Sequence, residues 1–391
     1  MLAMDDFRLD ESFLRDITGR ARNGEADVDG AVRRAREAQG LTPEDMVALW
    51  SAGGLDTDAV YGLAKDVRRA QSGRLETFAP FYLTNTCDGV CRMCGMRRDN
   101  EAIERDTADP ARIEEQLRIL RHRGMRAVAL VTGEYRAARR GWAMRYVNQA
   151  LGSALAMQFT HVLLNAGGID ATEFDPLLAG VERAVDGSVT PQITISNFQE
   201  TYCRIHYAKF MGTDSDNPRA DFDRRLTGFD RARRAGLRFA NPGILLGLNR
   251  DLGWELAGFA THARYLRSRG MQVYLSVPRL RQIAGNHHQR GVSDEEFVRI
   301  VSILSLGLPD CKIVITTREP VQMQHKLVPI IAVLSAGSSA VAPYTETSAH
   351  YRIETSQFRV VDQRPFEQIL GEHLCAGITI ANFEPANHSI A

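Results

Sequence analysis

Residues 82–98 read YLTNTCDGVCRMCGMRR and begin at the end of a hydrophobic, strand-like run at 78–83. Within them Cys87, Cys91 and Cys94 form a C-x3-C-x2-C array that holds half of the six cysteines of the chain. Clustered thiolates select soft metals such as zinc, copper(I) or iron with sulfide. A disulfide would leave one thiol unpaired, and a structural zinc site usually takes four ligands grouped as two separated pairs. The array therefore favours an iron–sulfur cubane with one iron left open, with zinc and a distant fourth ligand as the alternative.

The composition is that of an ordinary globular chain of 391 residues. Charged residues make up 25% and hydrophobic residues 44%, which are typical soluble values. The formal net charge is zero, so no overall field attracts nucleic acid or an anionic membrane. No apolar run approaches the roughly 20 residues that span a bilayer, and the first residues lack the pattern of a signal peptide. We therefore expect a cytoplasmic protein without a nucleic-acid or membrane partner.

Short β-rich runs alternate with amphipathic helices from residue 78 onward. About eight such units in about 270 residues imply a parallel sheet with right-handed crossovers, and they match a (β/α)8 barrel of the TIM type. We predict an N-terminal helical extension at 1–75, the barrel at 76–344, and a C-terminal segment at 345–391 that packs over the barrel mouth. The expected strands span 78–83, 127–132, 161–165, 192–196, 239–246, 272–277, 312–316 and 339–343.

Polar residues follow the ends of several expected strands, which is where a barrel of this type carries its active site. Gly133 and Glu134 follow the second expected strand. Glycine permits close approach of a ligand, and a carboxylate accepts hydrogen bonds from an ammonium group. Gln199 and Glu200 follow the fourth expected strand and offer two further polar groups. The sequence therefore predicts several ligand-binding side chains on the same rim as the thiols.

Arg318 follows the seventh expected strand, and its rigid fork of donors suits a carboxylate ligand. The structural alternative is a salt bridge from Arg318 to Glu134 or Glu319. Ser335 lies in a segment rich in glycine and serine, which can hydrogen-bond a small ligand or simply connect two elements.

The motifs YLTNTCDGVCRMC, TGEY, FQETY, FMG, NPGILLGL, LSVPR and TTREP resemble the aromatic amino acid lyases among the radical S-adenosylmethionine (SAM) enzymes. The likeness covers roughly residues 78–343. Within this group, which includes tyrosine lyases, it is strongest to the tryptophan lyase that makes 3-methyl-2-indolic acid for nosiheptide-type thiopeptides. The resemblance implies a [4Fe-4S] cluster and SAM as cofactors, and an electron donor such as flavodoxin or ferredoxin.

The resemblance also implies roles for individual residues, in three groups. The expected cluster ligands are Cys87, Cys91 and Cys94, the expected SAM contacts are Gly133, Glu134, Gln199 and Glu200, and the expected substrate contacts are Tyr82, Arg318 and Ser335. Tyr82 is expected beside the substrate amine, and Arg318 on the substrate carboxylate.

The activity implied by the resemblance uses a 5′-deoxyadenosyl radical that takes hydrogen from the amino group of L-tryptophan. A bond at Cα then breaks, and the product is 3-methyl-2-indolic acid. A second interpretation keeps the radical chemistry but has tyrosine, or a modified aromatic amino acid, cleaved between Cα and Cβ. A third interpretation, from another class, is an iron–sulfur or zinc protein that senses redox state through binding.

Two other groups of residues are expected to be structural. Cys203, Cys311 and Cys375 lie far apart in sequence, and isolated cysteines commonly behave as small buried hydrophobic residues. They therefore do not suggest a second cluster. The adjacent histidines His287 and His288 are expected in a solvated polar loop, because two neighbouring side chains rarely share one metal ion.

Overall fold

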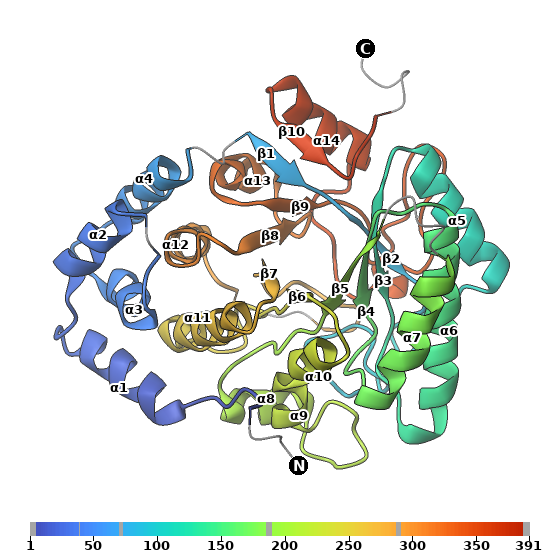
Figure 1. Ribbon diagram of the computed structural model, residues 1–391, viewed down its shortest axis with the longest axis horizontal. Coiled ribbons are helices and arrows are strands. Elements are labelled where there is room, and N and C mark those ends of the chain that lie inside the picture. Colours follow the sequence, from blue (N-terminus) through green and yellow to red (C-terminus); the bar gives the residue numbers. More distant parts are fainter. Residues whose placement is uncertain (1–4, 39, 70–72, 185–189, 287–290, 386–391) are drawn as a thin grey trace.

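The computed structural model describes residues 5–38, 40–69, 73–184, 190–286 and 291–385. His287 and His288 lie outside the described residues. Within these ranges ten strands form one sheet in the order β10-β1-β9-β8-β7-β6-β5-β4-β3-β2, and their pairs are parallel. Figure 1 shows the strands curling around the centre of the molecule, with helices on the outside.

The strands are short, and most of them follow the expected alternation with helices. Their bounds are β1 Arg74–Glu76, β2 Ala79–Tyr82, β3 Ala127–Val131, β4 His161–Asn165, β5 Gln192–Ser196, β6 Phe239–Asn241, β7 Gln272–Ser276, β8 Lys312–Thr316, β9 Val333–Ser335 and β10 Thr379–Ala381.

Helices cover the outer face of the sheet, and the chain carries further helices near both of its ends. Their bounds are α1 Glu11–Arg22, α2 Val28–Arg36, α3 Pro43–Ser51, α4 Thr57–Arg68, α5 Pro110–His122, α6 Ala137–Ala156, α7 Ala171–Ala184, α8 Arg204–Met211, α9 Phe222–Leu226, α10 Gly228–Arg234, α11 Leu252–Ser268, α12 Asp294–Gly307, α13 Val321–Leu327 and α14 Phe366–Cys375, with short 3-10 turns η1 Val328–Ile330 and η2 Ile353–Thr355. None of these described helices has both the length and the apolar character needed to cross a membrane.

The inner strands read as continuous apolar runs because both of their faces are buried. All five residues of β3, AVALV, are buried, and four of the five residues of β4 are buried. This pattern is typical of a parallel sheet covered by helices. The helices between the strands carry their own start signals. At α12, Ser293 and Glu296 form a reciprocal capping box.

The two sides of the curled sheet approach each other between β2 and the segment that follows β9. The Ser335 hydroxyl donates to the carbonyl oxygen of Phe78 at 3.1 Å. The Ala342 amide donates to the carbonyl oxygen of Tyr82 at 3.1 Å. The sheet therefore wraps around an interior space whose rim carries the loops after the strands. The expected barrel-type α/β fold is confirmed.

Helices α1 to α4 pack outside the barrel helices α11 and α12, as Figure 1 shows at its left. The helical character expected of the N-terminal segment is therefore observed, although Arg74–Glu76 already belongs to the sheet as β1. The division of the chain at residues 75 and 344 stays a prediction.

Three expected elements differ from the structure. The last barrel strand is β9 at Val333–Ser335, whereas the expected strand at 339–343 contributes only isolated bridges. β9 has only three residues, too few for an alternating pattern to stand out. Strand β6 ends at Asn241 instead of 246, and the helix expected at 221–235 is divided into α9 and α10 at Thr227.

Candidate active site

One cavity of about 180 Å³ opens at the carboxyl ends of the strands. Its lining includes all but one of the expected site residues, although they come from loops far apart in sequence. These lining residues are Tyr82, Cys87, Cys91, Cys94, Gly133, Glu134, Glu200, Arg318 and Ser335. The exception is Gln199, which is buried outside the lining and donates to the Phe222 carbonyl oxygen at 3.5 Å.

The cysteine loop presents its three thiols to this cavity. The amides of Gly89 and Glu134 donate to Cys87 Sγ at 3.3 and 3.2 Å. A Cβ at Gly89 would lie 3.3 Å from Cys87 Sγ and 3.6 Å from Cys91 Sγ, so a residue without a side chain keeps the space between the thiols open. Burial raises the pKa of Cys87 to about 11 and also raises the pKa of Cys91 and Cys94. The thiols therefore keep their protons until a metal displaces them.

This arrangement fits a cluster of several atoms. The three thiols line one shared cavity, and the backbone amides of Gly89 and Glu134 donate to Cys87 Sγ. Amide donors of this kind stabilise the thiolates that ligate iron–sulfur clusters.

Gly133 lets two segments of the site meet. A Cβ at this position would lie 2.7 Å from Cys87 Cβ, much closer than real side chains approach. The glycine of the TGEY motif is therefore needed to bring the segment after β3 against the cysteine loop. Its contribution to the site is the close packing of the loop that carries Cys87.

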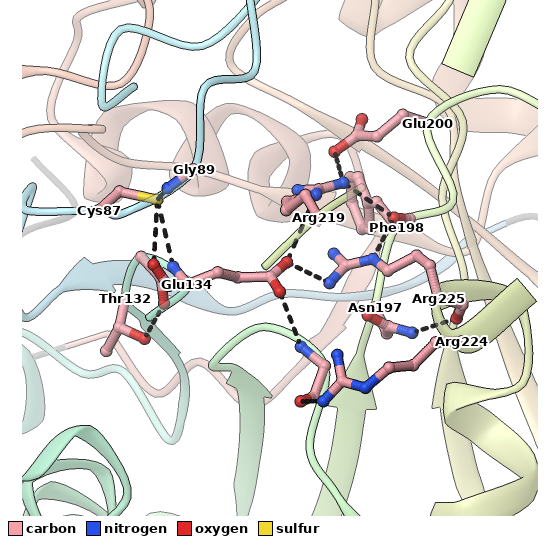
Figure 2. A network of polar contacts seen from close by, with 12 residues as sticks. Cys87, Gly89, Thr132, Glu134, Asn197, Phe198, Glu200, Arg219, Arg224 and Arg225 are labelled. Atoms are coloured by element: carbon pink, nitrogen blue, oxygen red, sulfur yellow. Dashed lines mark hydrogen bonds and ion pairs between the residues drawn. The ribbon is translucent and has the colours of Figure 1, made fainter. Parts of the chain in front are cut away.

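Glu134 lies at the centre of a network of buried charges (Figure 2). Its Oε1 pairs with Arg225 Nη1 and lies 3.4 Å from Arg219 Nε, and its Oε2 accepts from the Gly168 amide at 3.3 Å. Arg219 in turn reaches Glu200 at 3.2 Å. Burial alone would raise the pKa of Glu134, but Arg225 and Arg219 hold it below its ordinary value. The side chain is therefore ionised and already paired.

Glu200 lies in an unusual backbone conformation that the surroundings impose. Its φ is 69°, in the left-handed region that a residue with a side chain seldom adopts. Its carbonyl oxygen accepts from the Leu245 amide at 2.9 Å. The next two residues are held by Glu255, which accepts from the Thr201 hydroxyl at 2.6 Å and the Tyr202 amide at 2.8 Å. Backbone strain of this kind is commonly found at ligand sites.

Arg318 presents its guanidinium to the same cavity. The guanidinium carbon lies 3.4 Å from the ring centre of Phe358, and burial lowers the pKa of Arg318. In the described part of the chain, no carboxylate lies within ion-pair distance of it. The salt bridges considered from the sequence are therefore wrong, because Glu134 pairs with arginines from another loop.

Glu319, the neighbour of Arg318, is also engaged elsewhere. Its carboxylate pairs with Arg279, and Arg281 reaches it at 2.9 Å. Glu319 therefore does not pair with its neighbour Arg318, and the guanidinium of Arg318 has its donors available to the cavity.

Sequence reasoning missed several residues of the site, and four of them contact residues that it did predict. Arg219 and Arg225 come from the segment around α9, whose many charges look like a solvated helix face. Gln357 and Phe358 come from the C-terminal segment, which was expected over the mouth but without named contacts. A local signal for their roles is absent because each contacts a residue of the site that lies far away in the chain, such as Glu134, 91 positions from Arg225, or Tyr82, 275 positions from Gln357.

The three cysteines outside the cysteine loop are not all buried, although burial was expected for each of them. Cys311 is buried as expected, but Cys203 is partly exposed and Cys375 is exposed. Cys203 Sγ lies 3.1 Å from His206 Nδ1 on the same helical turn. Cys375 ends α14, whose buried face is made by other residues.

Comparison with known proteins finds one matching domain family and similar enzymes. The Biotin and Thiamin Synthesis associated domain matches residues 276–376, which carry Arg318, Ser335 and Gln357. The 2-iminoacetate synthase of Escherichia coli (strain K12) is 28% identical over 370 residues, which cover 93% of this chain and 90% of that protein. The chain is thus similar to 2-iminoacetate synthase along almost its whole length.

Solved structures share the fold. HydG, a maturase of the [FeFe]-hydrogenase, superposes with a TM-score of 0.81 at 24% identity, over 95% of this chain and 80% of HydG. Methylornithine synthase (PylB) superposes with a TM-score of 0.68 at 17% identity, over 90% of this chain and 97% of PylB.

The similarity to 2-iminoacetate synthase confirms the expected enzyme class, a carbon–carbon lyase of the radical SAM type. The same similarity confirms the expected cofactors, a [4Fe-4S] cluster and SAM. The enzyme interpretation is therefore preferred to a redox-sensing binding protein.

Proposed function

We propose that the protein is a radical SAM lyase that cleaves the Cα–Cβ bond of an aromatic amino acid, with L-tyrosine as the first candidate. The relationships support tyrosine better than tryptophan, which the sequence motifs had favoured. The bacterial relative is named for 2-iminoacetate. This two-carbon imine is what remains of an amino acid whose side chain has been lost by Cα–Cβ cleavage.

The observation that carries this proposal is the free guanidinium of Arg318 in a cavity shared with three thiols. Arg318 is partly buried, and a cation that is partly withdrawn from water without a carboxylate partner carries a cost that an anionic ligand relieves. The planar guanidinium suits the carboxylate of an amino acid. Tyr82 lines the same cavity, and its phenol oxygen can accept a hydrogen bond from the amine.

The other side of the cavity suits the cofactors. Cys87, Cys91 and Cys94 would hold the cluster, which together with SAM supplies a 5′-deoxyadenosyl radical. Glu134 offers an acceptor for the amino group of SAM, and the adjacent arginines offer donors for its carboxylate. The residues that hold the substrate would set which hydrogen meets the radical. The electron would come from a small carrier such as flavodoxin or ferredoxin.

The inner lining supports a phenol as the aromatic side chain. Most of the inner residues are apolar, but Ser196, Asn241 and Ser276 form a polar patch among them. Ser196 Oγ donates to Asn241 Oδ1 at 2.9 Å, and Asn241 Nδ2 donates to Ser276 Oγ at 2.9 Å. A phenol can donate to these hydroxyl oxygens and accept from the Ser276 hydroxyl, whereas the indole nitrogen of tryptophan can only donate.

The test supplies tyrosine and tryptophan separately to the anaerobically reconstituted enzyme, with SAM and a reductant. With tyrosine we expect 5′-deoxyadenosine together with 4-methylphenol and glyoxylate, the hydrolysis product of the imine. Turnover of tryptophan alone, to 3-methyl-2-indolic acid, would overturn the tyrosine assignment in favour of tryptophan. Two buried cysteines provide matched variants: Cys91→Ala should abolish 5′-deoxyadenosine release, whereas Cys311→Ala, outside the cavity, should retain it.

A further inference from the structure

A segment at residues 352–362, here called the strap, lies across the cavity and contributes Gln357 and Phe358 to its lining. The Gly95 amide donates to the carbonyl oxygen of Gln357 at 2.9 Å, and the Gln357 amide donates to that of Ser339 at 3.1 Å. The strap is thus fixed between the cysteine loop and the end of the barrel sheet. A Cβ at Gly95 would lie 2.6 Å from the carbonyl oxygen of Gln357, so the glycine after Cys94 allows this close approach.

The side chain of Gln357 connects two residues of the site. The hydroxyl of Tyr82 donates to Gln357 Oε1 at 2.6 Å. Gln357 Nε2 donates to Cys94 Sγ at 3.4 Å. One amide therefore contacts a residue expected to ligate the cluster and a residue expected beside the substrate amine.

The chemistry of the two neighbours determines the orientation of this amide. The sulfur of a metal-bound cysteine has no proton and can only accept, so the amide nitrogen must face it. The amide oxygen then faces the phenol, which has one hydrogen to give. The reverse orientation would put two acceptors together at the sulfur. Binding of a metal to Cys94 therefore strengthens the arrangement that the structure already has.

The contact of Gln357 with Cys94 would affect the cluster, and its contact with Tyr82 would affect the substrate. A hydrogen bond to a cluster sulfur stabilises the more electron-rich state and raises the reduction potential. A phenol whose only hydrogen is donated to Gln357 presents just its lone pairs to the cavity. Tyr82 is then an acceptor, which suits an amine and disfavours a carboxylate at the same place.

The next residue of the strap acts on the other end of the substrate. The ring of Phe358 flanks the guanidinium of Arg318, and the carbonyl oxygen of Phe358 accepts from the Ser339 hydroxyl at 2.6 Å. An aromatic face beside a guanidinium limits its orientations without using its donors. The dipeptide Gln357–Phe358 thus contacts both polar residues expected at the amino acid substrate.

We propose that Gln357 is a positioning residue that orients Tyr82 as the acceptor for the substrate amine and donates to the cluster ligand Cys94. This inference rests on the proposed function for the identity of the substrate. The link to the cluster does not depend on the substrate, so the two parts can be measured separately.

Three variants separate the two contacts. Gln357→Leu removes both of them, Gln357→Glu keeps an acceptor for Tyr82 but loses the donor to sulfur, and Tyr82→Phe removes only the phenol. The matched control is Gln363→Leu, because Gln363 belongs to the same C-terminal segment but does not line the cavity, and its side chain donates to the Val360 carbonyl oxygen at 3.1 Å.

The readouts are the midpoint potential of the cluster, followed by electron paramagnetic resonance, and the Kd of L-tyrosine with SAM present and no reductant. Gln357→Leu and Gln357→Glu should shift the potential to more negative values, whereas Tyr82→Phe should leave it unchanged. Gln357→Leu and Tyr82→Phe should raise the Kd about tenfold, the size of one hydrogen bond, whereas Gln357→Glu should change it little. The control should match the wild type in both.

Iron and sulfide content equal to the wild type establishes that each variant holds its cluster. If fully loaded Gln357→Leu and Gln357→Glu both keep the wild-type potential, the inference is overturned. It is also overturned if Tyr82→Phe raises the Kd but Gln357→Leu does not. If the wild type binds no aromatic amino acid while the potential shifts as expected, the proposed function fails and the link from Gln357 to Cys94 stands.

Discussion

Glu134 and Arg318 line the same cavity, but the charge of Glu134 is paired within the protein, whereas the charge of Arg318 is not. Glu134 is 5% exposed and is held by Arg219 and Arg225. Arg318 has an aromatic ring beside it and no carboxylate partner in the described part of the chain. The Glu134 side is therefore organised before any ligand arrives, whereas the Arg318 side is completed by an anion.

The difference indicates which side of the cavity stabilises the fold and which side is available to bind a ligand. Buried ions that satisfy one another hold the loops together, and removing one leaves the others unpaired. A partly buried cation without a partner adds nothing to the stability of the fold, because its desolvation costs free energy that is not offset until a ligand binds. We expect mutations on the first side to reduce stability, and mutations on the second side to reduce substrate affinity.

The largest effect is expected from Glu134→Gln, which leaves Arg225 and Arg219 without their shared carboxylate. The free energy of unfolding should fall by about 3–5 kcal/mol, the usual cost of leaving a buried charge unpaired. Urea unfolding of the metal-free protein measures it. Glu104→Gln is the control, because the pair between Glu104 and Arg352 is exposed and should contribute under about 1 kcal/mol. Equal losses in the two variants would contradict the description of the Glu134 side.

A smaller effect, on affinity instead of stability, is expected from Arg318→Met. The Kd of L-tyrosine should rise by roughly 30-fold, or about 2 kcal/mol, the contribution of hydrogen bonds to a charged group. Calorimetric titration with SAM present measures it, and the stability of the metal-free protein in urea should not fall, because Arg318 has no ion pair to lose. Arg359→Met is the control, because it removes an exposed cation from the same strap. An unchanged Kd for Arg318→Met would mean that the substrate carboxylate binds elsewhere.

The smallest effect concerns Glu255, a buried carboxylate whose neighbours are neutral donors. Burial raises its pKa to about 6, whereas the two arginines lower the pKa of Glu134. The folded state therefore holds a proton on Glu255 at a pH where the unfolded chain has lost it, and stability falls as pH rises from about 4.5 to about 6. The loss should be on the order of 1–2 kcal/mol.

Urea unfolding across this pH range, compared with Glu255→Gln, isolates the contribution of Glu255. The variant should lack this part of the pH dependence because an amide does not titrate. A wild-type protein that instead gained stability relative to the variant as pH rises would show that the carboxylate is stabilised by a cation, as Glu134 is.

Local patterns predicted the barrel and much of the rim. The apolar runs of β3, β4 and β5 were found with nearly correct bounds, because each is buried along its length and bounded by polar residues. β9, with three residues, gave no such pattern. Gln199 was expected at the rim because it follows a strand, but the left-handed conformation of Glu200 turns the chain there, and Gln199 is buried.

The sequence by itself determined the chemistry of the thiols and the repeated strand and helix units, because both depend on residues close together in the chain. The tertiary structure decided which charges are paired and which are free. Arg225 lies 91 positions from Glu134, and Gln357 lies 263 positions from Cys94. Contacts over such separations depend on how the strands curl and where the strap lies. They leave no periodic signal in the sequence, and here they determine how the site meets its ligands.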